Sequence, residues 1–159
     1  MDLTRVIHPE EPWFHLVVGS AEDLSNAVRA VERTGKTAVR VVRGKHATTE
    51  VAFFNECAAA LQFPLYFGEN WDAFRDCVLD LAWLEAPGCA LIIADALHLL
   101  EKAKTEAFSH FVHIVAEAAQ HWNKLAEPKP FHIVFHTVPA EESAAKNRYQ
   151  TAGLAVTKH

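Results

Sequence analysis

The pattern of apolar and polar positions predicts a chain in which short strands alternate with helices. Short apolar runs rich in β-branched residues indicate strands, and apolar residues that recur every three or four positions indicate helices with one buried face. Strands are expected at residues 14–18, 37–44, 89–95 and 131–137. Helices are expected at residues 21–34, 49–61, 70–84, 96–101, 105–124 and 140–149.

Local signals mark where several of these helices begin. Ser20 and Asp23 have the spacing of a capping box, in which each residue bonds to the backbone of the other. Thr48 or Thr49 is expected to cap the second helix, and Gly68 interrupts the chain before the third. The boundaries therefore come from residue chemistry as well as from periodicity.

Strands that alternate with helices are typical of an α/β fold with right-handed crossovers. The run CALIIAD at residues 89–95 is too short for a helix and suits a strand buried on both faces. We expect a single domain, 1–159, with a small parallel β-sheet packed by α-helices. Three strands would form its core, residues 1–36 would add a fourth, and the tail after residue 138 would fray beyond its helix.

Composition and charge exclude several classes of function. The chain has 159 residues and a net charge of -5, so it lacks the basic surface that nucleic acid requires. No apolar run approaches the ~20 residues of a membrane span, and the N-terminus shows no secretory signal. Three cysteines at irregular spacings predict reduced thiols in a cytoplasmic protein.

The segment YFGENWDAFRDCVLD concentrates negative charge on one predicted helix face. With about 100° per residue, Glu69, Asp72, Asp76 and Asp80 lie opposite an apolar face of Trp71, Phe74, Val78 and Leu81. An ordinary solvated face accounts for the first two carboxylates, because acidic residues at a helix N-terminus interact favourably with its dipole. It does not account for the last two, whose i, i+4 repulsion only Arg75 relieves. The row is better explained by recognition of a cationic partner.

The residues PLYFGENWDAFRDC resemble the signature of the barstar family of intracellular ribonuclease inhibitors. The family pattern is an apolar residue, proline, an aromatic residue before Gly-Glu-Asn, then Leu or Trp, Asp-Ala, and a second Asp followed by Cys. The similarity extends over residues 37–137. Residues 1–36 form a strand–helix extension outside it, and residues 138–159 form a tail.

This resemblance implies that the protein inhibits a secreted or delivered bacterial ribonuclease, as an immunity protein does. Asp72 and Asp76 match the family's principal contact residues, and Asp76 would occupy the place of a substrate phosphate. Glu117 matches a further contact on the penultimate helix. Arg75 departs from the family, which has an aromatic residue there. The predicted partner-binding surface comprises Tyr66, Gly68, Glu69, Asn70, Asp72, Arg75, Asp76, Asp80, Glu117 and His121.

Histidines support a second hypothesis from a different class. The residues His110, His113, Glu117 and His121 share one helix face and could hold zinc in a metal-dependent hydrolase. A third hypothesis is a barstar fold recruited to a different protein partner, with Arg75 as its best support. We otherwise find no catalytic motif and expect no cofactor. Cys77 falls at the edge of the apolar face and is expected to be packed rather than nucleophilic.

The remaining histidines have structural interpretations. His132 and His136 point to the same face of the last predicted strand and are expected to be core residues with satisfied hydrogen bonds. His46 and His98 are expected to be isolated at the surface.

Overall fold

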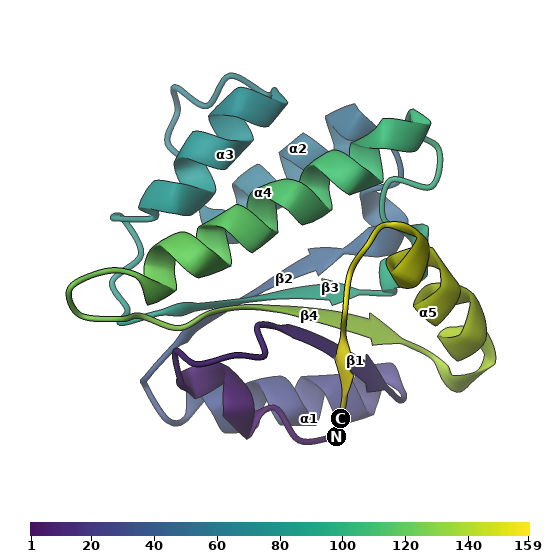
Figure 1. Ribbon diagram of the computed structural model, residues 1–159, viewed down its shortest axis with the longest axis horizontal. Coiled ribbons are helices and arrows are strands. Elements are labelled where there is room, and N and C mark those ends of the chain that lie inside the picture. The colour runs from purple at the N-terminus through teal and green to yellow at the C-terminus, as the bar shows by residue number, and fades with distance from the viewer.

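Five parallel strands form one sheet through the centre of the molecule (Figure 1). The computed structural model describes residues 1–159. The strands are β1 (Phe14–Val18), β2 (Ala38–Arg43), β3 (Cys89–Ala94), β4 (Phe131–Thr137) and β5 (Thr157–Lys158). Their order across the sheet is β2-β3-β4-β1-β5. The predicted α/β class, the parallel sheet and the fourth strand from the N-terminal segment are confirmed.

Strand β5 is the one strand that the sequence did not predict. It pairs with the outer edge of β1, where His15 lies opposite Thr157. The backbone N–H of His159 also donates to the carbonyl of Leu16 at 3.0 Å. The expectation that the tail frays is therefore wrong, because β1 offers an unpaired edge that these residues cover.

Helices cover both faces of the sheet (Figure 1). One face carries α1 and the 3₁₀ turn η1, and the other carries the remaining four helices. The helices are α1 (Ala21–Glu32), α2 (Glu50–Leu61), α3 (Trp71–Asp80), α4 (Thr105–Asn123) and α5 (Glu142–Thr151). Four 3₁₀ turns accompany them: η1 (Thr4–Ile7), η2 (Gly44–His46), η3 (Ala96–His98) and η4 (Pro139–Glu141).

The capping residues act largely as expected. Ser20 and Asp23 form a complete capping box at the start of α1. The hydroxyl of Thr49, rather than that of Thr48, accepts from the N–H of Ala52 and begins α2. These contacts satisfy backbone donors that the first turn of a helix leaves free.

Two predicted helices are shorter in the structure. Helix α3 was expected to reach residue 84 but ends at Asp80, because Leu81 adopts a left-handed backbone with φ 43°. The N–H of Leu81 then closes the last turn on the carbonyl of Cys77. The helix predicted at residues 96–101 is the single turn η3.

Strand side chains alternate between two apolar layers. Ile133 and Phe135 of β4 pack with α2, α3, α4 and α5, whereas Val134 packs with α1 and η1. Residues Cys89–Ile93 of β3 are all buried, which confirms the expectation of a strand covered on both faces. None of the helices combines the length and apolar composition needed to cross a membrane.

Candidate functional site

Helix α3 is capped and anchored by residues of the predicted signature. The side chain of Asn70 accepts from the N–H of Ala73 at 2.9 Å and donates to the carbonyl of Gly68 at 3.1 Å. The inner face of the helix buries Phe74, Cys77 and Val78. Asn70 and Gly68 thus fix the start of the helix, and the buried face fixes its rotation about its own axis.

The carboxylates of α3 face solvent. Asp72, Asp76 and Asp80 are all exposed and lie one turn apart, and the side chain of Asp76 is 77% exposed. Glu69 is also exposed, but it precedes the helix and has φ 50°. Its assignment to the helical face is therefore wrong, and it belongs to the turn that leads into α3.

The loop before α3 presents two large side chains to solvent. Tyr66 is 79% exposed and its neighbour Leu65 is fully exposed. Tyr66 was among the predicted site residues, and Leu65 was not. The signal for Leu65 was its position in a loop between Pro64 and Gly68, where no helix or strand face can bury it. Exposed apolar side chains beside a charged row are typical of protein-binding surfaces.

Arg75 forms an ion pair with Glu117 across two helices. Its Nε donates to Oε2 of Glu117 at 2.7 Å, and a terminal nitrogen donates to Oε1 of the same carboxylate. The other terminal nitrogen lies 3.7 Å from Oδ1 of Asp76. Glu117 raises the pKa of Arg75, and the hydrogen bonds from Arg75 lower the pKa of Glu117.

The histidines of α4 line the same side of the molecule as Glu117. His110, His113 and His121 are exposed, and the ring of His110 packs edge-on against Trp71 at 5.8 Å between centroids. No group of three or more His, Cys, Asp or Glu side chains is arranged to hold a metal ion. Glu117, the carboxylate of the proposed zinc stripe, is paired with Arg75 instead.

Cys77 is packed, as expected from its place on the helix. Burial raises the pKa of its thiol, and the nearby carboxylates of Asp76 and Asp80 act in the same direction. A raised pKa disfavours the thiolate, which is the nucleophilic form. All three cysteines are free and buried.

The buried histidines have hydrogen-bond partners, as predicted for His132 and His136. His136 donates from Nε2 to the carbonyl of Gly19 at 3.1 Å. His132 lies 2.9 Å from His15, a third buried histidine that the sequence did not single out. His46 is exposed as expected, but His98 is not isolated, because it contacts Glu101 and Glu141.

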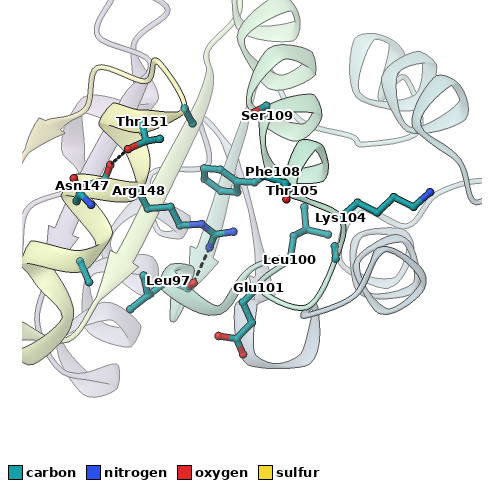
Figure 2. A pocket seen from close by; sticks show the side chains of 13 residues that line it. Leu97, Leu100, Glu101, Lys104, Thr105, Phe108, Ser109, Asn147, Arg148 and Thr151 are labelled. Carbon is teal, nitrogen blue, oxygen red and sulfur yellow. Dashed lines mark hydrogen bonds between the residues drawn. The ribbon is translucent and has the colours of Figure 1, made fainter.

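A cleft of about 680 Å³ lies between η3, the start of α4 and α5 (Figure 2). The side chain of Arg148 lines the cleft and donates to the carbonyls of Leu97 and Leu99. Its guanidinium lies 4.0 Å from the centre of the Phe108 ring. Figure 2 shows the side chain of Lys104 extending away from Arg148. The two cations therefore do not point toward a common binding site. The hydrogen bonds of Arg148 instead join α5 to the segment after β3.

Comparisons with solved structures show the fold. Cdc6p from Pyrobaculum aerophilum superposes on 91% of the chain with a TM-score of 0.60 and 14% sequence identity. The ORC2 protein from Aeropyrum pernix, in its ADP form, superposes on 91% with a TM-score of 0.63 and 10% identity. The chain spans 38% and 40% of these two proteins. At such low identity the likeness extends to the α/β architecture alone.

Comparison with protein families places the chain more closely. No curated protein matches its sequence. The family model described as Barstar (barnase inhibitor) matches residues 37–152, a segment that includes α3, α4 and α5. This segment also contains the capped acidic helix and the loop before it. The chain therefore belongs to the barstar family.

Proposed function

We propose that this protein inhibits a bacterial ribonuclease by placing the acidic face of α3 in the enzyme's cationic active site. The observation that carries the proposal is the row of exposed carboxylates formed by Asp72, Asp76 and Asp80. A ribonuclease site must be positively charged to bind a phosphodiester backbone. Carboxylates held on a rigid helix can pair there with arginine, lysine and protonated histidine.

The residues would divide this work between them. Asp76, the central carboxylate, would take the place of a substrate phosphate, with Asp72 one turn before it. Tyr66 would pack against the rim of the enzyme's site, joined by the neighbouring Leu65. Asp80 and His121 would lie toward the edge of the contact, where charge affects the rate of association more than the final affinity.

The proposal includes the setting in which the protein acts. As an immunity protein it would bind the ribonuclease inside the cytoplasm, before the toxin is exported or after it arrives from a neighbouring cell. It would need no cofactor and would catalyse no reaction itself. The alternative of a different protein partner rested on a free positive charge at Arg75, and that guanidinium is paired with Glu117.

The direct test is inhibition of a barnase-type ribonuclease by the wild type and by Asp76→Asn. This substitution keeps the shape of the side chain and removes its charge. We expect the variant to bind at least ~30-fold more weakly, the size typical of an interface hot spot. The matched control is Glu32→Gln, which makes the same charge change on α1, across the sheet from α3.

Measurements at two salt concentrations distinguish long-range electrostatic attraction during association from the direct contacts in the complex. Higher salt should slow association of the wild type, because the acidic row attracts a cationic enzyme over a distance that salt shortens. Absence of inhibition by the wild type at both salt concentrations would reject this class of ribonuclease as the target. Equal inhibition by the wild type and Asp76→Asn would reject the role of Asp76.

A further inference from the structure

Arg75 lies between two carboxylates that come from different helices. Both oxygens of Glu117 on α4 accept from its guanidinium, and Oδ1 of Asp76 on α3 is 3.7 Å from the remaining terminal nitrogen. The side chains of Arg75 and Glu117 are 43% and 36% exposed, whereas that of Asp76 is 77% exposed. Arg75 and Glu117 are therefore less exposed to solvent than the neighbouring carboxylate of Asp76.

This geometry changes the expected role of Glu117. A free arginine in the centre of an acidic surface would repel a cationic partner and would compete for Asp76. The bidentate bond to Glu117 cancels the charge of Arg75 and fixes the direction of its planar guanidinium. Asp76 can then direct its carboxylate to solvent.

We propose that Glu117 is a positioning residue, which neutralises and holds the guanidinium of Arg75 and so supports partner binding without touching the partner. The inference rests on the proposed function and deepens it. It differs from the family resemblance, which implies that Glu117 contacts the partner. The partner would thus need a cation for Asp76 but none for Glu117.

The two roles predict different results in a double-mutant cycle. Glu117→Gln leaves the guanidinium charge uncompensated beside Asp76, and we expect inhibition of the ribonuclease to weaken at least ~10-fold. Arg75→Met in the same protein removes that charge, so the double variant should return to within ~3-fold of the wild type. Arg75→Met alone should bind at least as tightly as the wild type, since it adds a free carboxylate to the surface.

A gain from Arg75→Met that is larger in the Glu117→Gln protein than in the wild type is a result that independent, direct contact of Glu117 with the partner does not produce. A double variant that remains as weak as Glu117→Gln would overturn the inference, because it would mean that Glu117 touches the partner. Glu32→Gln is the control for net charge. It alters total charge as much as Glu117→Gln does, but it should leave inhibition unchanged.

A partner-independent probe keeps the inference testable if no ribonuclease is inhibited. A hexa-arginine peptide can report on the acidic surface of the wild type, the three cycle variants and Glu32→Gln by isothermal titration at low salt. We expect the same order, with Glu117→Gln the weakest and the double variant restored. Equal binding by Glu117→Gln and Glu32→Gln would overturn the positioning role. Failure of the proposed function and failure of this inference thus give separate results.

Discussion

At the scale of single residues, three histidines form a hydrogen-bonded chain with one direction. His132 must donate from Nε2 to the carbonyl of His8, at 2.6 Å, because a carbonyl only accepts. Burial lowers the pKa of His132 and of His15, so both rings are neutral. Nδ1 of His132 then accepts from Nε2 of His15 at 2.9 Å, and Nδ1 of His15 accepts from Nε2 of His159 at 2.9 Å. This arrangement requires neutral His15 and His132.

His15 should make stability depend on pH. Burial lowers its pKa to about 3, and the neighbouring His132, His159 and Arg5 act in the same direction. The unfolded chain binds a proton at His15 below about pH 6.5, whereas the folded protein does not. The contribution of neutral His15 to the free energy of unfolding is therefore present above pH 6.5 and is lost as the pH falls toward 3. We expect this residue alone to lower the free energy of unfolding by about 1 kcal/mol between pH 7 and pH 5.5.

Urea unfolding at several pH values measures this effect. His15→Leu should show a shallower fall than the wild type over that interval, whatever its stability at pH 7. Burial also lowers the pKa of His132, so part of the slope should persist in the variant. His46→Gln, at an exposed histidine, should keep the wild-type slope. A His15→Leu protein with the wild-type slope would mean that His15 does not carry the effect.

At the scale of elements, α3 depends on the cap at Asn70. Asn70→Ala removes the acceptor for the N–H of Ala73 and should lower the free energy of unfolding by about 1 kcal/mol. Asn70→Asp keeps a good capping acceptor and should leave stability nearly unchanged. Urea denaturation of the three proteins checks this. Equal loss in both variants would show that the amide donor to Gly68, and not the cap, stabilises the turn.

Elements with local chemical signals were predictable from the sequence. The capping box at Ser20, a threonine cap at residue 48 or 49 and the continuous apolar run of β3 each act within a few residues. The early end of α3 was not predictable, because Leu81 suits a helix but adopts a left-handed conformation there. Arg75 and Glu117 are 42 residues apart, so only the packing of α3 on α4 brings them together.

At the scale of the whole molecule, β5 covers part of the outer edge of β1 and so links the C-terminus to the sheet. Lys158 of β5 also forms a salt bridge with Glu142 of α5, and His159, the residue after β5, is hydrogen-bonded to His15. A two-residue strand leaves no periodic pattern, which is why the sequence predicted a frayed tail. Its pairing depends on an edge supplied by β1, more than a hundred residues earlier in the chain.

Removal of residues 157–159 tests how much the pairing of β5 contributes to the stability of the fold. We expect the free energy of unfolding to fall by about 2 kcal/mol, since a few hydrogen bonds of ~0.5–1.5 kcal/mol each are lost. Inhibition of the ribonuclease should be unchanged, because α3 packs on α4 and α2, whereas β5 pairs with β1 at the edge of the sheet. A truncated protein that keeps full stability would show that β5 adds nothing to the fold. A loss of inhibition with stability intact would place the tail in the contact surface.

The connection from β2 to β3 contains two helices, α2 and α3, although a single helix suffices to join neighbouring parallel strands. Helix α2 already covers the sheet beside β2. The outer face of α3 is therefore not needed to connect the strands or to cover the sheet. Substitutions there meet few constraints from the core. Under the proposed function, the partner specificity of this scaffold can therefore be changed by substitutions on one helix face, with little effect on the stability of the fold.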